Sequence, residues 1–278
     1  MADSRSPGTA FVLGGGGTLG SVEVGMLQAL TERGIVPDLV IGSSVGALNG
    51  AIFAANPTIE TVEGLTNLWT EFQANDIFAG SLVSRISTLA KLGTHIHANE
   101  SLRGLLERHL PGVLIEDLPV IYQCVAASIE RAGPHWFRDG PVVDAVMASC
   151  AVPGLFPPVA VGGEHFYDGG LVSSIPVGRA VQLGAKTVYV LHVGRIEQAL
   201  KPPRWPWEVG YVAFEIARRS RFVEDMANLP DGVSVRALPS GTPAGSLRLR
   251  SRNDEPAGPR IRQAYLATAD YLDALPSD

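Results

Sequence analysis

The stretch that decides the fold is TAFVLGGGGTLGSVEVGMLQALTERGIVPDLVIGSSVG, residues 9–46. Residues 9–13 are mostly apolar and are suited to a buried strand, which a run of glycines ends. Residues 21–33 carry apolar side chains at helical spacing, and 38–41 form a second strand-like run before a second glycine turn. A helix over 47–55 follows. This alternation of strand, turn and helix predicts an α/β fold, with a parallel sheet covered by helices.

The rest of the chain extends this pattern. Residues 58–112 are mostly helical and are expected to form a cap over the sheet edge. No interior linker separates two cores, so residues 9–278 are expected to form one domain after a disordered N-terminus, residues 1–8. The remaining expected elements are strands at 120–127, 187–193 and 233–238, helices at 142–149, 177–183, 207–229 and 260–275, an irregular loop at 151–159, a hairpin turn at 162–163 and a flexible loop at 240–259.

The composition excludes several classes of protein. Hydrophobic residues make up 46% of the 278 residues and charged residues 18%, which is enough to bury a sizeable core. A net charge of −6 argues against nucleic-acid binding. The two cysteines, Cys124 and Cys150, are expected to be buried thiols, because a zinc site needs more ligands at paired spacing. The N-terminus lacks the apolar region of a signal peptide, and no stretch has the length of a membrane span. A cytoplasmic protein with at most peripheral membrane contact is therefore expected; the sequence indicates no oligomeric state.

The first glycine turn, Gly15-Gly16-Gly17-Thr18-Leu19-Gly20, allows two functional interpretations. It satisfies the G-x-G-x-x-G pattern of a dinucleotide-binding turn, which expects an acidic residue at the end of the second strand to bind ribose. The nearby acid, Asp38, lies at the start of that strand instead. Converging backbone amides at a helix start can equally stabilise an oxyanion. Which use applies depends on the group that faces the turn, and purely structural glycines are a third interpretation.

The second turn, Gly42-Ser43-Ser44-Val45-Gly46, lies between a strand and a helix. In that setting G-x-S-x-G is typical of a nucleophile elbow, where the glycines allow a tight turn that exposes the central serine. A helix cap is the alternative role for Ser44. Ser43 precedes the apex of the turn and is the poorer candidate. The pattern therefore favours Ser44 as a nucleophile.

A nucleophilic serine needs a base. An order of serine, aspartate and histidine is possible if Asp144 or Asp168 precedes His192, but none of the six histidines lies in an evident loop with a matching acid. Asp168-Gly169-Gly170 offers a second solution, because two glycines after a strand let the carboxylate enter a cleft without crowding. An ordinary turn would have the same sequence, so the residues alone leave the choice of base open.

Taken in order, these motifs resemble those of the patatin-like phospholipase family. The resemblance rests on the two glycine turns, on Asp168-Gly169-Gly170 and the residues up to 177, and on residues 148–158, ASCAVPGLFPP. It covers about residues 9–194. It implies a three-layer α/β/α fold with a central, mostly parallel sheet, and a Ser–Asp dyad without histidine.

In this resemblance Ser44 attacks the ester carbonyl of a lipid and Asp168 accepts its proton. Backbone amides around Gly15, Gly16, Gly17 and Thr18 form the oxyanion hole, and no metal or organic cofactor is implied. The chain departs from the family at Leu19, where arginine or lysine is usual. We expect this change to alter rate or headgroup preference without loss of activity.

Other functions stay open at this stage. The same dyad would serve a general esterase, a lipase or an acyl-thioester hydrolase, and the first turn would serve a nucleotide-binding module. A catalytically silent lipid-binding relative is a further alternative. Residues 201–207, KPPRWPW, combine cations with tryptophans as membrane interfaces do, and Arg248, Arg250 and Arg252 lie in the expected flexible loop. These segments predict peripheral contact with anionic lipid.

Overall fold

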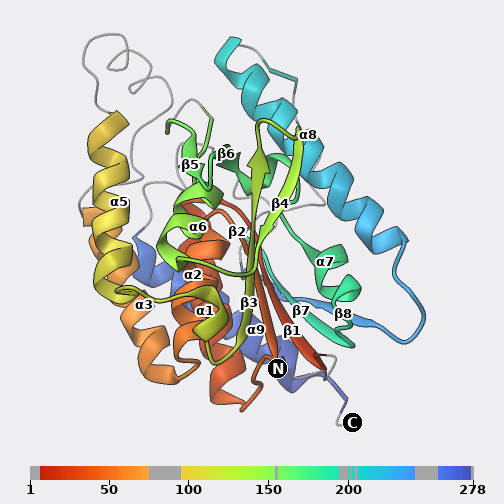
Figure 1. Ribbon diagram of the computed structural model, residues 1–278. Coiled ribbons are helices and arrows are strands. Elements are labelled where there is room, and N and C mark those ends of the chain that lie inside the picture. Colours follow the sequence, from red (N-terminus) through yellow and green to blue (C-terminus); the bar gives the residue numbers. More distant parts are fainter. Residues whose placement is uncertain are drawn as a thin grey trace.

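A computed structural model describes residues 7–74, 95–153, 156–193, 200, 202–203, 206–241 and 256–276. Within these residues the chain forms one eight-stranded sheet with helices packed on it (Figure 1). The strands are β1 (Thr9–Leu13), β2 (Leu39–Ser43), β3 (Ile121–Ser128), β4 (Gly133–Phe137), β5 (Val159–Val161), β6 (Glu164–Asp168), β7 (Thr187–Leu191) and β8 (Ser234–Ala237). The helices are α1 (Ser21–Glu32), α2 (Val45–Ala55), α3 (Ile59–Ala74), α5 (His95–His109), α6 (Val142–Ser149), α7 (Val177–Gln182), α8 (Pro206–Ala227) and α9 (Ala257–Asp273).

The centre of the sheet is parallel. Its strand order is β5-β6-β3-β2-β1-β7-β8, with β4 pairing separately with β3. The pairs β1–β2, β2–β3, β1–β7 and β7–β8 are parallel, whereas β4, β5 and β6 join antiparallel. The prediction of a mostly parallel sheet is therefore confirmed.

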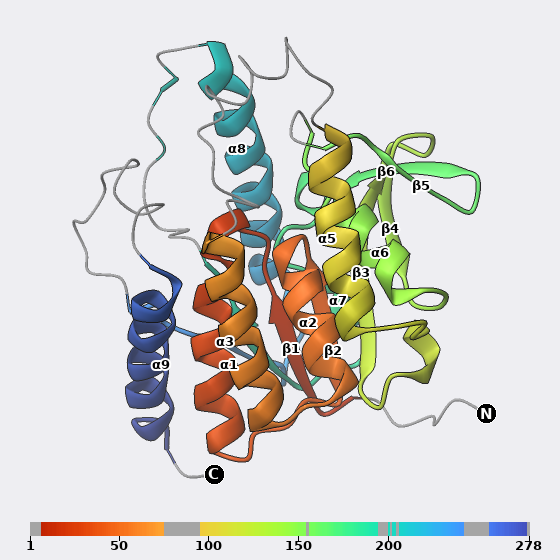
Figure 2. The same ribbon diagram turned by 90° about the vertical axis from the view of Figure 1, so that its left-hand side faces the viewer.

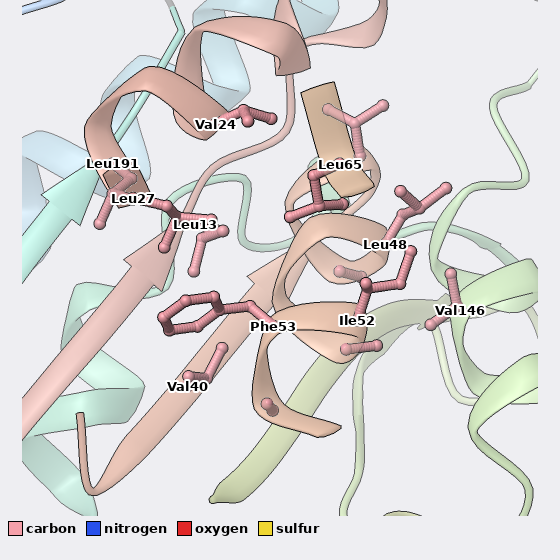
Figure 3. Packing of buried hydrophobic residues seen from close by; sticks show 14 of the residues in the cluster. Leu13, Val24, Leu27, Val40, Leu48, Ile52, Phe53, Leu65, Val146 and Leu191 are labelled. Carbon is pink, nitrogen blue, oxygen red and sulfur yellow. The ribbon is translucent and has the colours of Figure 1, made fainter. Parts of the chain in front are cut away.

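Helices cover both faces of the sheet, as the three-layer fold requires. Figure 2 shows α1, α2, α3, α5 and α9 in front of the strands and α7 and α8 behind them. Alternation along β1 explains the layers. Phe11 and Leu13 point into the core beneath α1 and α2, and Ala10 and Val12 into a smaller core that includes α7. In Figure 3, Phe53 of α2 lies over Leu13 and Val40.

The first and last helices share the larger core. α9 lies so close along α1 that a Cβ on Gly25 would be 2.1 Å from the carbonyl oxygen of Ile261. The guanidinium of Arg33 also pairs with the carboxylate of Asp273 at 2.7 Å. The C-terminal helix therefore packs onto the same layer as the N-terminal one.

The structure differs from the sequence predictions at several elements. The expected cap, residues 58–112, contains α3 and α5, and α3 packs against α1, α2 and α9 within the helical layer. The strand β4 was not predicted, because Pro134 and His135 interrupt a plain apolar alternation. The helix α2 begins at Val45, directly after Ser44. Residues 1–6 of the expected disordered N-terminus lie outside the described residues, whereas the carbonyl of Gly8 accepts hydrogen bonds from the amides of Lys186 and Thr187. Residues 242–255 of the expected flexible loop also lie outside, and α9 begins at Ala257, within the range expected for that loop.

Candidate active site

Ser44 occupies a sharp turn between β2 and α2. Its backbone has φ 55° and ψ −126°, a strained conformation for a residue with a side chain. The turn is tight because α2 starts directly over the ends of β1 and β2. A Cβ on Gly42 would lie 2.4 Å from the Cα of Ala47, and one on Gly46 would lie 2.3 Å from the carbonyl oxygen of Leu13. Both glycines are therefore required for the elbow.

Strand register brings Asp168 to this turn. Ser43, the last residue of β2, pairs with Val125 of β3, and Asp168, the last residue of β6, pairs with Ala126. The two strands thus end at consecutive positions of β3. The hydroxyl of Ser44 donates a hydrogen bond to Oδ2 of Asp168 at 2.6 Å, and both side chains are buried.

The second oxygen of Asp168 is held by the glycines that follow it. The amide of Gly170 donates to Oδ1 at 2.7 Å. A Cβ on Gly169 would lie 2.2 Å from the carbonyl oxygen of Val125, so glycine lets the chain turn against β3. Burial raises the pKa of Asp168 to about 6, although the hydrogen bonds from Ser44 and Gly170 partly oppose the rise. The carboxyl group is thereby a stronger base than a solvated aspartate.

Ser149, at the end of α6, is a site residue that the motif analysis did not single out. The amide of Ser44 donates to the Ser149 hydroxyl at 2.9 Å, and that hydroxyl donates to the carbonyl of Val125 at 2.7 Å. Ser149 is fully buried. Its presence within residues 148–158, which resemble the family segment, was the available signal.

The first glycine turn faces Ser44. A Cβ on Gly15 would lie 3.3 Å from the Cβ of Ser44 and 3.2 Å from the hydroxyl of Ser174. The amide of Gly15 donates to the carbonyl of Ser174 at 2.9 Å, so it is already occupied. None of the described residues accepts a hydrogen bond from the amide of Gly16 or Gly17. Of the four residues expected in the oxyanion hole, Gly15 therefore contributes shape, while Gly16, Gly17 and Thr18 provide the amides to be tested.

The remaining parts of this turn have structural contacts. η1 (Gly17–Gly20) leads into α1, and Gly17 has a positive φ of 57°. Leu19 is partly buried against the larger core. Asp38, the acid that a nucleotide site would need after β2, lies before that strand and accepts a hydrogen bond from the amide of Thr9 at 2.8 Å.

No histidine in the described part of the chain hydrogen-bonds to the side chain of Ser44 or Asp168. His165 is exposed, and its Nδ1 pairs with a Glu130 carboxylate oxygen at 2.7 Å. His192 follows β7, and it is not among the hydrogen-bond partners of the Ser44 and Asp168 side chains. Within these residues, Asp168 is the titratable side chain that hydrogen-bonds to the Ser44 hydroxyl.

The two cysteines are buried thiols, as expected. Burial raises the pKa of Cys124 to about 12, and burial together with the nearby Asp168 charge raises the pKa of Cys150. Across the described residues, no group of three or more histidine, cysteine or acidic side chains is arranged to hold a metal ion.

The described helices include none that is long and apolar enough to cross a membrane. The proposed interfacial residues Lys201, Arg204 and Trp205, the side chain of Trp207, and Arg248, Arg250 and Arg252 lie outside the described part. Peripheral membrane contact through these segments stays a prediction.

A family model and several curated proteins that resemble this chain point to the same family. Residues 11–181 match the patatin-like phospholipase family. A patatin-like phospholipase domain-containing protein of Caenorhabditis elegans is 34% identical over 190 residues, which cover 68% of this chain and 14% of that protein. The lysophospholipase nte1 of Aspergillus terreus is 30% identical over 191 residues, covering 67% and 12% respectively. An NTE family protein of Mycobacterium tuberculosis is 35% identical over 179 residues, covering 63% and 46%.

Among solved structures, VipD from Legionella pneumophila is similar in fold. It superposes with a TM-score of 0.50 at 15% sequence identity, covering 97% of this chain and 67% of that chain. The present chain spans less than half of the length of each of the three curated relatives above.

Proposed function

Because this chain belongs to the patatin-like phospholipase family, we propose that it hydrolyses carboxylic ester bonds of phospholipids or related lipids through Ser44 and Asp168. The observation that carries the proposal is the 2.6 Å hydrogen bond between the Ser44 hydroxyl and a buried carboxylate with a pKa of about 6. A carboxylate of this kind is ionised at neutral pH, yet accepts a proton more readily than a solvated one.

In the acylation step, Ser44 Oγ attacks the ester carbonyl carbon while Asp168 Oδ2 takes the hydroxyl proton. The carbonyl oxygen becomes an oxyanion, which the amides of Gly16, Gly17 and Thr18 stabilise. As the tetrahedral intermediate collapses, the bond to the alcohol breaks and Asp168 gives its proton to the leaving oxygen. The acyl group is now esterified to Ser44.

In deacylation, water replaces the serine hydroxyl as the nucleophile, and Asp168 again accepts the proton. Asp168 takes a proton from a water molecule, whose oxygen attacks the acyl carbon. Collapse of the second intermediate releases the carboxylic acid and returns the proton to Ser44 Oγ. The hydrogen bond from Gly170 holds Asp168 Oδ1 throughout, so Oδ2 stays directed at Ser44.

The proposed substrate class is supported by the family and by relatives that include a protein named as a lysophospholipase. A general esterase or an acyl-thioester hydrolase would use the same residues. Hydrolysis of phospholipid vesicles, lysophospholipid micelles, short water-soluble esters and acyl thioesters should therefore be compared in parallel. We expect the lipid esters to give the highest kcat/KM.

The central test is labelling with a fluorophosphonate probe. We expect wild type to be labelled, Ser44→Ala to be unlabelled and Asp168→Ala to be labelled far more slowly. Ser43→Ala, the adjacent hydroxyl, serves as the matched control and should retain labelling. Labelling that persists in Ser44→Ala would overturn the proposed nucleophile.

A further inference from the structure

A buried polar cluster lies behind the first glycine turn and is not part of the Ser44–Asp168 pair. Its side chains are Glu23 of α1, Asn49 of α2 and Trp69 of α3, and none is more than 3% exposed. Burying an amide and a carboxylate in an apolar layer costs free energy unless their hydrogen bonds are made. The arrangement of those bonds therefore indicates what the cluster holds in place.

Asn49 is the centre of the cluster. Its Nδ2 donates to the carbonyl oxygen of Gly20 at 3.0 Å and to Oε2 of Glu23 at 2.8 Å, while its Oδ1 accepts from Nε1 of Trp69 at 2.9 Å. Both amide hydrogens are used, and the indole donor fixes which side of the amide is oxygen. The side chain has one orientation that satisfies these partners, and that orientation binds the backbone of Gly20.

Gly20 is also packed from two sides. A Cβ at this position would lie 2.5 Å from Cζ2 of Trp69 and 3.0 Å from the Cβ of Val45, the residue after the nucleophile. Gly20, at the end of the first glycine turn, is thus packed between the indole ring of Trp69 and the first turn of α2. Hydrogen bonding and packing restrain the same residue.

We propose that Asn49 is a positioning residue that fixes the oxyanion amides relative to the nucleophile, an inference that rests on the proposed function. Asn49 and Val45 belong to α2, whose start directly follows Ser44, and Gly20 ends the short helix that begins at Gly17. The Asn49–Gly20 hydrogen bond therefore joins the element carrying the nucleophile to the element carrying the amides of Gly16, Gly17 and Thr18. Trp69 extends the restraint to α3.

The experiment must separate positioning from simple stabilisation of the fold. A thionoester replaces the carbonyl oxygen with sulfur, which is larger and a weaker hydrogen-bond acceptor. Tightly placed oxyanion donors consequently favour the oxygen ester over the thionoester. The ratio of kcat for a short-chain 4-nitrophenyl ester to kcat for the matching thionoester reports on the amides, and loss of folded protein does not change it.

Asn49→Leu removes all three hydrogen bonds and keeps a side chain of similar size. We expect kcat for the oxygen ester to fall about 100-fold with a smaller change in KM, and the oxygen-to-sulfur ratio to fall with it. Trp69→Phe removes one donor and keeps an aromatic ring. We expect a change in the same direction, on the order of 10-fold. This second variant decides the question if Asn49→Leu does not fold.

Tyr122→Phe is the matched control. The buried hydroxyl of Tyr122 donates to the carbonyl of Ala47 at 2.7 Å. The variant therefore loses a hydrogen bond to α2 but keeps the hydrogen bond between Asn49 and Gly20 of the first glycine turn. It should lower the melting temperature and leave the ratio at the wild-type value. If Asn49→Leu and Trp69→Phe also keep the wild-type ratio while Ser44→Ala is inactive, the positioning role is wrong. If Ser44→Ala retains turnover, the proposed function itself fails.

Discussion

The amide of Ser44 and the hydroxyl of Ser149 form a 2.9 Å hydrogen bond across 105 residues of sequence. The same hydroxyl donates to the carbonyl of Val125, against which Gly169 packs. Ser149 therefore connects the turn at Ser44 to the residue of β3 against which the turn at Gly169 packs. A strained elbow needs such support, because its backbone conformation persists only when the surrounding structure holds it.

Replacing Ser149 with alanine tests this support. Ser149→Ala leaves the amide of Ser44 and the carbonyl of Val125 buried without this partner, which should cost about 1–3 kcal/mol of unfolding free energy. Because the elbow loses its anchor, we expect kcat to fall by about 10- to 100-fold with little change in KM. Urea unfolding and steady-state kinetics measure the two effects.

Ser128→Ala is the control, because it removes a buried hydroxyl just as Ser149→Ala does. Ser128 is buried, donates to Oε2 of Glu164 at 3.0 Å and accepts from the amide of Arg131 at 3.2 Å, away from Ser44. It should lose comparable stability and keep the wild-type kcat. Equal kcat values for the two variants would show that Ser149 has no special role in the elbow.

The pKa of Asp168 predicts the pH dependence of activity. The base must be ionised to accept the Ser44 proton, and its pKa is raised to about 6 by burial. We expect kcat/KM to fall as the pH drops through about 6 and to be constant above that point, until other groups titrate. A profile that stays flat down to pH 4 would be incompatible with Asp168 as a buried base.

The same shift makes a prediction about stability. Since the pKa of Asp168 is higher when folded than its ordinary value of 3.8, the folded state binds more protons between these two values. The stabilising effect of the protonated carboxyl group is complete only below the unfolded pKa of 3.8 and is lost as the pH rises through about 6. Asp168→Asn removes this titration. The free energy of unfolding of Asp168→Asn relative to wild type should increase by about 2 kcal/mol between pH 4 and pH 7.

Urea unfolding of both proteins at the two pH values measures that difference. Exposed groups with shifted pKa values, such as Glu130, titrate equally in both proteins and cancel in the comparison. A difference that does not change with pH would mean that the carboxylate is as well solvated when folded as when unfolded.

The features that sequence could predict are local ones. Strand, glycine turn and helix follow one another directly at residues 9–20 and 39–55, so periodicity and glycine spacing were sufficient for the elbow at Ser44. Asp168 required more, because its approach depends on the register of β6 against β3. The motif resemblance supplied this pairing where the local pattern allowed an ordinary turn.

Local sequence patterns did not indicate the two residues that support the site, Ser149 and Asn49. Ser149 and Asn49 hydrogen-bond to backbone groups of segments that are distant in sequence, and no spacing of residues near either one indicates those partners. The placement of α3, which was expected in a cap, could not be predicted for a similar reason. The apolar face of α3 gave no sign that its partners would be α1 and α9 in the main layer.

Leu19 allows a test of headgroup preference. It is partly buried in η1, just before α1, and packs against the larger core, so its side chain contributes apolar contact and no charge. We expect Leu19→Arg to raise the relative rate on anionic lipid headgroups, because a cation near the turn attracts them. Leu19→Met, which keeps size and apolar character, should retain the wild-type order of substrates. An unchanged order in Leu19→Arg would remove this position from the determinants of specificity.

Two glycine substitutions distinguish a required glycine from an incidental one. Gly46→Ala places a Cβ 2.3 Å from the carbonyl oxygen of Leu13, which belongs to the sheet and cannot move aside without distorting β1. We expect a loss of about 3 kcal/mol in unfolding free energy and loss of fluorophosphonate labelling, since α2 must shift away from the elbow. Gly64→Ala, within α3, meets no atom within 4 Å. The free energy of unfolding of Gly64→Ala should rise by up to about 1 kcal/mol, because alanine has a higher helix propensity than glycine. The fluorophosphonate probe should label this variant at the wild-type rate. If Gly46→Ala labels as fast as Gly64→Ala, the close packing of α2 on β1 does not hold Ser44 in its reactive geometry.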